Sequence, residues 1–345
     1  MKLLLFEWLS GGGLGPLPDG AFDANSSMMR QGREMLIAVC EDFLEAGVDV
    51  VLPLDKRIIG LVPDFAGAEK VGIGDADDLE NRLVEIAGDV DVIMLIAPET
   101  DCCLSTCIDW LQPFHSKLIS PGQEFAKLAS NKQATFDYLS AQRFDSYPQG
   151  IDFEKYWSTK LPVFPLPAVL KPNDGAGSEE VRLITDWGDF ERLASDQKPD
   201  FKNHQYRLEE FISGTAVSVS IICGPEQNYV LAPTVQIFDQ KPFGHYVESG
   251  YPVESAIADR AIQLAIQAVS AMPPTQGYIG MDIVISDESS QHDSLIEINP
   301  RLTMSYLKLR QIYNDNLAKL ILDQAEVLPE NEAQPSRCIF RQPNF

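Results

Sequence analysis

Two carboxylates and one amide lie close together toward the carboxyl end of this 345-residue chain, on two apolar segments separated by a polar run. Asp282 lies in the first segment, and Glu297 and Asn299 lie in the second. A turn centred on the polar run, between Ser289 and Ser290, makes an antiparallel hairpin in which Asp282 faces Glu297. Because side chains alternate across a strand, Asn299 lies on the same face as Glu297, and three oxygen ligands converge.

Such a trio suits a hard divalent cation. Mg²⁺ prefers a few protein oxygens together with waters and phosphates, whereas Ca²⁺ usually demands more protein ligands. The sequence therefore predicts a magnesium site at Asp282, Glu297 and Asn299, with Mn²⁺ as an alternative ion. The competing interpretation is that both carboxylates are ordinary charges on a solvated sheet face. Both lie within Ile, Val and Leu runs, however, where unpaired charges are costly.

A second group of residues could hold phosphates. An apolar segment ends at Lys171, and a loop of small residues follows before the chain becomes apolar again at Val181. Backbone N–H groups of such a loop can approach phosphate oxygens, and the lysine adds a point charge. An ordinary hairpin turn is the alternative, and the chain has no P-loop motif. The loop residues concerned are Gly175, Ala176, Gly177 and Ser178.

Two further segments complete a candidate nucleotide site. Lys132 follows Ser130 and Asn131 at an expected helix start, where a capping side chain and the positive end of the helix dipole favour a phosphate. A merely solvated lysine is the alternative. The run 207–214 reads as a strand leaving one lobe for another, and its exposed backbone groups could bind an adenine edge. The adenine-side residues are Glu209, Glu210, Phe211 and Ile212.

Strands and helices alternate in the N-terminal third of the chain. Apolar strands are expected at 2–8, 48–52 and 92–96, and helices at 28–46, 79–87 and 104–111. This alternation predicts an α/β unit built on a parallel sheet.

A glycine loop follows the first expected strand. The position three after Gly13 is Pro16, so the loop lacks the G-x-G-x-x-G spacing of a dinucleotide site and disfavours a nicotinamide dehydrogenase. Its backbone N–H groups could still bind an anion, although a plain tight turn explains the loop equally well. The substrate-side candidates are Ser10, Gly11, Gly12 and Gly13.

The chain changes character after a domain boundary expected near residue 120. Helical segments at 124–141 precede a proline-rich stretch, and turn-separated strands follow. One long helix at 254–272, two final strands and a C-terminal helix at 306–325 end the pattern. The expected strands before that helix lie at 168–171, 181–184, 206–212, 217–223 and 229–238.

Composition argues against several classes of function. The formal net charge of −24 repels nucleic-acid phosphates, so no nucleic-acid partner is expected. No apolar run approaches the roughly 20 residues that cross a bilayer, so no membrane partner is expected either. Cys102, Cys103 and Cys107 cluster without paired spacing and with no histidine closer than His115, which disfavours a zinc site. Small core residues are the better interpretation of this cluster. The six cysteines form no regular framework, which favours reduced thiols in the cytoplasm.

Taken in order, these segments resemble the ATP-grasp superfamily over roughly residues 120–325. A lysine at a helix start and a lysine before a glycine flap precede Glu-Glu-Phe-Ile-x-Gly at 209–214, and Asp282 precedes Glu-x-Asn-Pro-Arg at 297–301. Within the superfamily, the run 297–306, together with Phe-Glu-Trp at 6–8 and the glycine loop, resembles the tyramine–glutamate ligase group of methanofuran-type cofactor synthesis.

The resemblance implies an α/β ATP-grasp fold. Its N-terminal Rossmann-like, pre-ATP-grasp domain would be a parallel-sheet unit at 1–120, and two α+β lobes would clasp ATP. The central lobe with the glycine flap would span 121–204, the C-terminal lobe with the magnesium site 205–330, and a tail 331–345.

The resemblance also implies the residue roles. Lys132 and Lys171 would hold nucleotide phosphates beneath the 175–178 loop, 209–212 would line the adenine pocket, and the Asp282 trio would bind magnesium. Two departures from the family pattern stand out. An acidic residue often binds the ribose two positions after the hinge glycine, but Thr and Ala follow Gly214 here. An arginine often lies two residues before the first magnesium ligand, but Gly280 occupies that place, which leaves Arg301 as the cation for an acyl phosphate.

The implied function is an ATP- and Mg²⁺-dependent carboxylate–amine ligase that forms an amide through an acyl phosphate. L-glutamate would be the acid, and tyramine or a related aromatic amine the acceptor. The alternatives are another ATP-grasp ligase, D-alanine-ligase-like or peptide-tailoring, and a non-catalytic ATP-binding scaffold. Small-molecule substrates are the expected partners, and a homodimer is left open. The amine must attack in its neutral form, but the group that deprotonates it is not identified; His245 is one candidate, with an ordinary loop histidine as the alternative.

Overall fold

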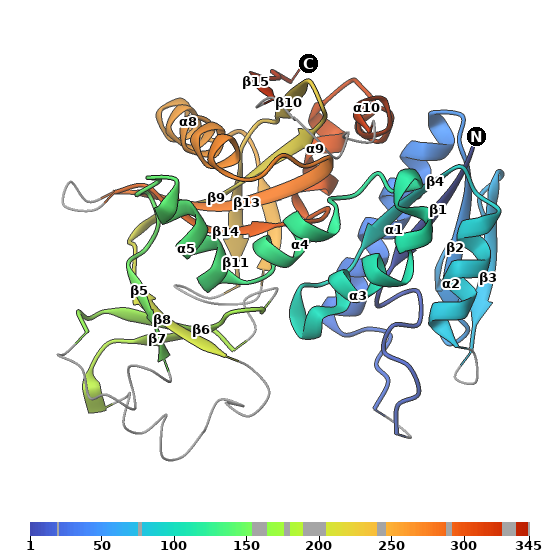
Figure 1. The fold of residues 1–345 in the computed structure, drawn as a ribbon, viewed down its shortest axis with the longest axis horizontal. Helices are drawn as coiled ribbons and strands as arrows, with labels where there is room; N and C mark the ends of the chain where they lie inside the picture. Colours follow the sequence, from blue (N-terminus) through green and yellow to red (C-terminus); the bar gives the residue numbers. More distant parts are fainter. Residues whose placement is uncertain are drawn as a thin grey trace.

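The computed structural model describes residues 1–18, 21–74, 78–153, 164–175, 180–188, 205–239, 246–287, 292–325 and 336–343, which build three sheets (Figure 1). The first sheet is parallel with strand order β3-β2-β1-β4, as the alternating pattern predicts. Its strands are β1 (Lys2–Glu7), β2 (Asp49–Asp55), β3 (Ala68–Ile73) and β4 (Val92–Ile96).

Helices cover both faces of this parallel sheet. The odd-numbered side chains Leu3 and Leu5 of β1 pack on the side of α1 (Ser27–Glu45), while Leu4 and Phe6 pack on the side of the other two helices. These two are α2 (Leu79–Gly88) and α3 (Cys103–Trp110). The apolar run 3–6 of β1 therefore contributes alternate side chains to two separate cores, which is typical of a doubly wound α/β unit.

The second sheet is small and antiparallel, with order β5-β8-β6-β7. Two helices precede it, within the helical segments predicted at 124–141. The second begins at Lys132 as predicted, where the side chain of Asn131 accepts a hydrogen bond from the Ala134 N–H. The elements are α4 (Gln123–Ala129), α5 (Lys132–Ala141), β5 (Gly150–Asp152), β6 (Ala168–Pro172), β7 (Arg182–Ile184) and β8 (Tyr206–Glu210).

The third sheet has seven strands. Its long strand β9 pairs with β13 along its whole length and with β10 and β11 on its other side. The helix α8 (Ser255–Ala271) covers one face, and α9 (Ser305–Ile312) and α10 (Leu317–Gln324) cover the other. The strands are β9 (Gly214–Cys223), β10 (Gln227–Val230), β11 (Thr234–Phe238), β12 (Tyr246–Gly250), β13 (Gly277–Ser286), β14 (Ser294–Asn299) and β15 (Arg337–Phe340).

Several expected elements are divided in the structure. The single strand predicted at 229–238 is two strands, β10 and β11, separated around Pro233, which has no N–H to donate to a ladder. The C-terminal helix is also two, because the Asn316 side chain accepts from the Lys319 N–H and caps α10 separately. The short strands β3, β5, β12 and β15 were not predicted, and β15 lies within the expected tail. The predicted domain boundaries stay predictions.

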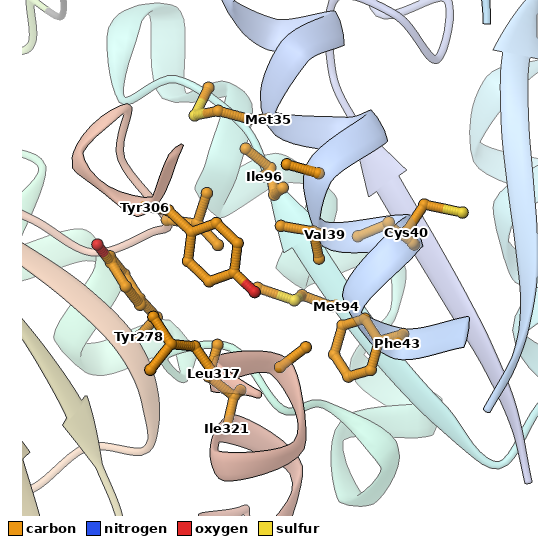
Figure 2. Close-up of a cluster of buried hydrophobic side chains, with 14 of the residues drawn as sticks. Met35, Val39, Cys40, Phe43, Met94, Ile96, Tyr278, Tyr306, Leu317 and Ile321 are labelled. Atoms are coloured by element: carbon orange, nitrogen blue, oxygen red, sulfur yellow. The ribbon is translucent and has the colours of Figure 1, made fainter. Parts of the chain in front are cut away.

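The N-terminal unit and the third sheet share one hydrophobic core. Figure 2 shows Met35, Val39 and Phe43 of α1 facing a group that includes Tyr278, Tyr306, Leu317 and Ile321. The second sheet has a separate, smaller core around β6 and β8. Two of the three units are therefore packed together as one frame. No helix within the described residues is long and apolar enough to cross a membrane, and all six cysteines are free thiols.

Hydrogen bonds to a buried carboxylate connect α1 with α9 beside this shared core. The Tyr306 hydroxyl donates to the Asp42 carboxylate of α1 over 2.6 Å, and the Arg310 guanidinium donates to the same carboxylate over 2.6 Å. Replacing Tyr306 by phenylalanine leaves one carboxylate oxygen short of a donor, so we expect the free energy of unfolding to fall by about 1–3 kcal/mol. Urea unfolding measures the change. Tyr138→Phe, at a half-buried tyrosine of α5, is the control, and an equal loss in both variants would contradict the expectation.

Candidate functional site

A cavity of about 580 Å³ lies where the three units meet. The N-terminal unit contributes Glu7 and residues of α1, the second sheet contributes Lys171 and Glu209, and the third sheet contributes Asp282. Nearly all of the expected nucleotide and metal residues that the structure describes line this one cavity: Lys132, Lys171, Gly175, Glu209, Glu210, Phe211, Ile212, Asp282, Glu297, Asn299 and Arg301. Ala176, Gly177, Ser178 and His245 lie outside the described residues.

The two carboxylates face each other as predicted from the hairpin. β13 and β14 pair with Asp282 opposite Glu297 and Gly280 opposite Asn299, and the register shifts just beyond Asp282. The Asn299 side-chain amide donates to Asp282 over 3.3 Å. Gln236 of β11, which the sequence reasoning missed, donates to the other Asp282 oxygen over 2.9 Å. The predicted trio is thus brought together, with a fourth polar side chain beside it.

The electrostatics of this pair fit a divalent cation. Desolvation raises the pKa of Asp282 to about 8, and the facing Glu297 carboxylate adds to the rise. Burial also raises the pKa of Glu297, but Lys132 and Lys171 outweigh it and hold that pKa below its ordinary value. A divalent ion would take the place of the proton on Asp282, and oxygen donors are those that Mg²⁺ prefers. Among the described residues, no group of three or more His, Cys, Asp or Glu side chains could hold a metal ion, so water or phosphate would complete the shell.

Lys171 is held by a buried chain of charges. Its ammonium lies 2.5 Å from one oxygen of Glu209, and the Arg207 guanidinium donates to the other oxygen over 3.1 Å. Arg207 is fully buried, stacks 4.5 Å above the Phe136 ring and leaves no room for a side chain at Gly150. The Glu209 carboxylate therefore fixes Lys171, and the backbone of Glu209 lies within the sheet between β5 and β6.

Lys132 contacts both the start of the glycine loop, at Gly175, and the predicted metal ligand Glu297. It is 7% exposed, and its ammonium donates to the Gly175 carbonyl over 2.7 Å and lies 3.1 Å from Glu297. Asn131, rather than Ser130, is the capping residue of its helix. The two predicted phosphate lysines therefore converge on the Glu297 end of the cavity.

The chain crosses from the second sheet to the third along one wall of the cavity, at 209–216. At the crossing, Gly214 has φ +155°, and a Cβ there would lie 2.2 Å from the Ile285 carbonyl oxygen. Only glycine allows this close approach of the strands. The predicted adenine segment therefore lines the cavity, although the N–H groups of Glu210 and Phe211 already donate to the Gln149 and Pro167 carbonyls.

Arg301 lies in the cavity wall but is already paired. Its guanidinium donates to Glu99 of the N-terminal unit over 2.8 and 3.1 Å, and Glu99 was not predicted as a site residue. Glu99 raises the pKa of Arg301 against the opposing effect of burial. Position 280, where related proteins often have an arginine, has no room for a side chain here. A Cβ at Gly280 would lie 2.5 Å from the Thr303 methyl group.

The glycine loop is placed differently from the other predicted residues. Leu9 lines the cavity, but Ser10, Gly11, Gly12 and Gly13 are not among the described lining residues. The N–H groups of Gly11 and Gly13 donate to backbone carbonyls of the preceding turn over 2.7 and 2.8 Å. Glu7, which the sequence reasoning did not single out, lines the cavity instead. Its signal was a carboxylate at the carboxyl end of a first parallel strand, where α/β sheets usually bind ligands.

Comparisons with known proteins agree with this geometry. A family model described as ATP-grasp domain matches residues 129–305. The tyramine–L-glutamate ligase of Methanocaldococcus jannaschii is 25% identical over 326 residues, which cover 94% of this chain and 89% of that protein. The enzyme of the same name from Methanocaldococcus fervens is 25% identical over 87% of this chain and 89% of its own length. A crystal structure assigned to the ATP-grasp superfamily, from Archaeoglobus fulgidus, is similar in fold with a TM-score of 0.69 at 20% identity, covering 95% of this chain and 90% of that one.

Proposed function

The chain belongs to the ATP-grasp family and is a carbon–nitrogen ligase, and we propose that it joins L-glutamate to tyramine or a related aromatic amine. The observation that carries the proposal is the cavity in which Lys132 and Lys171 converge on the Asp282–Glu297 pair. The lysines could bind phosphates, and the carboxylate oxygens beside them could bind a divalent ion. The proposed substrates are taken from the names of the two similar ligases.

In this proposal Asp282, Glu297 and Asn299 hold Mg²⁺, and the two lysines hold the nucleotide phosphates. The loop 175–178, of which 176–178 lie outside the described residues, would cover them, and residues 209–212 would line the adenine pocket. ATP would supply the phosphoryl group that makes the acid reactive as an acyl phosphate, and Mg²⁺ would neutralise its charge. Arg301, which Glu99 keeps in place, would bind that acyl phosphate.

These residues act through position and charge. A carboxylate is already nucleophilic, so phosphoryl transfer needs alignment and neutralisation of charge rather than an acid or a base. The buried Arg207–Glu209–Lys171 chain fixes one cation before substrate arrives, which lowers the cost of reorganisation. We further propose a cytoplasmic location, which the six free thiols support, and small-molecule substrates as partners. A homodimer stays a prediction.

The test is ADP release with ATP, Mg²⁺ and L-glutamate, with and without tyramine, with products identified by mass spectrometry. We expect ADP release that depends on tyramine and a product with the mass of glutamyl-tyramine. ADP release only with other amino acids or amines would indicate an ATP-grasp ligase of different substrate. ATP binding without ADP release under any condition would support a non-catalytic scaffold.

A further inference from the structure

Glu7 is a buried carboxylate in the wall of the cavity. It is the last residue of β1 and is 3% exposed. One carboxylate oxygen accepts the Leu9 N–H over 3.1 Å, and the other accepts the Ser10 N–H over 2.7 Å. Each oxygen keeps further acceptor capacity, since a carboxylate oxygen can accept about two hydrogen bonds.

Glu7 lacks the counter-ion that Glu209 and Glu297 of the same site have. Glu209 pairs with Lys171, and Glu297 pairs with Lys132. Within the described ranges no lysine, arginine or histidine lies within salt-bridge distance of Glu7. Burial raises the pKa of Glu7, although the Ser10 side chain, the backbone N–H groups of Ser10 and Leu9, and Arg301 act against the rise. An ionised carboxylate in this position is costly until a cation reaches it.

The surroundings of Glu7 are apolar and open toward the cavity. α1 passes the carboxylate at Gly32, where a Cβ would lie 2.7 Å from both carboxylate oxygens. Met28 and Met35 of α1 and Ile96 at the end of β4 line the same cavity. A carboxylate set in an apolar wall suits an ammonium group attached to an apolar body, and methionine side chains adapt well to an aromatic ring.

The charged side chains of the cavity indicate where the acid and the amine would each bind. The Arg301 guanidinium lies 3.5 Å from the side-chain oxygen of Asn299, a member of the predicted metal trio. It is also near enough to Glu7 to act against the rise in the pKa of that carboxyl. The acid's reactive carboxylate belongs at the Arg301 and metal side, which leaves the Glu7 side for the amine.

We propose that Glu7 binds the ammonium group of the amine substrate and accepts its proton, an inference that rests on the proposed ligase function. The neutral amine nitrogen attacks the acyl carbon, a C–N bond forms, and the C–O bond to phosphate breaks. The ammonium loses two protons overall. The first passes to Glu7 and then to water, and the second leaves with the phosphate as HPO₄²⁻.

The experiment compares tyramine with hydroxylamine, an acceptor that is largely uncharged at slightly alkaline pH and traps acyl phosphates as hydroxamates. With Glu7→Gln, ATP, Mg²⁺ and L-glutamate, we expect amide formation with tyramine to fall by at least about 100-fold and hydroxamate formation to stay within about threefold of wild type. Retained hydroxamate formation also shows that the variant folds.

Three outcomes would overturn the inference. Equal loss of both products would place Glu7 in activation of the acid, and unchanged amide formation would leave it no role. Wild-type protein that forms neither ADP nor hydroxamate with any acid would remove the proposed function itself, and the inference with it. These results differ from one another, so the two failures can be told apart.

A second variant probes the same contact from α1. Gly32→Ala would push a methyl group against the Glu7 carboxylate, so we expect the KM for tyramine to rise at least about tenfold with little change in the KM for ATP. Gly88→Ala in α2 is the matched control, because nothing lies within 4 Å of a Cβ there. A rise in both KM values for Gly32→Ala would point to a general distortion and contradict the proposal.

Discussion

Asp282→Asn is expected to lower turnover by about 1,000-fold while leaving the protein folded, because several kcal/mol of metal-dependent charge stabilisation are lost. The asparagine keeps the shape of the side chain and can still accept the hydrogen bond from Gln236. Steady-state ADP release at saturating ATP and Mg²⁺ measures the loss. Circular dichroism establishes that the variant is folded.

The same variant tests a pH dependence. Because the pKa of Asp282 is raised from 3.8 to about 8, the native metal-free protein keeps a proton that the unfolded chain loses over this range. Its stability should therefore fall as the pH rises from about 4 to about 8 and level off above. Mg²⁺ needs the ionised carboxylate, so its stabilising effect should grow over the same interval.

Thermal unfolding at a series of pH values, with and without Mg²⁺, checks both trends. The slope contributed by this carboxyl should disappear in Asp282→Asn, as should most of the Mg²⁺ effect. Near-normal turnover, or a Mg²⁺ stabilisation that the substitution does not change, would show that the metal binds elsewhere.

Lys171→Ala is expected to lower turnover by at least about 100-fold, as losing one preorganised charge at the transition state does. The substitution also leaves Glu209 facing the phosphate region without its nearest cation, since Arg207 contacts only the other oxygen. The KM for ATP should rise as well. ADP release over a range of ATP concentrations separates the two effects.

Lys319→Ala is the control, because Lys319 pairs with Asp323 on the exposed surface of α10. Its activity should match wild type. If Lys171→Ala kept normal activity, Lys171 would be a structural partner of Glu209 and not a phosphate ligand.

Local pairing explains which parts of the site could be predicted. Asp282 and Glu297 lie on one hairpin, so strand alternation and a turn position were enough to bring them face to face. The parallel sheet followed from the alternation of strands and helices in the same way. Short strands such as β5 and β15 were missed because three or four residues carry too little pattern.

Contacts between distant segments could not be predicted. Arg301 and Glu99 are 202 positions apart, and only the packing of the N-terminal unit on the third sheet brings them together. The glycine loop drew attention through its composition, while the adjacent Glu7 reaches the cavity. Gly32 of α1 leaves the space that the Glu7 carboxylate occupies, and no local sequence pattern connects these two residues.

The shared core has a consequence for synthesis of the chain. α1 packs on β1 and β2, which lie close to it in the sequence, and also on α9 and α10, which are translated much later. Until residue 321 emerges, the N-terminal unit therefore shows an apolar flank that includes Met35 and Val39. Nascent chains of intermediate length are the form most exposed to aggregation and most in need of a chaperone.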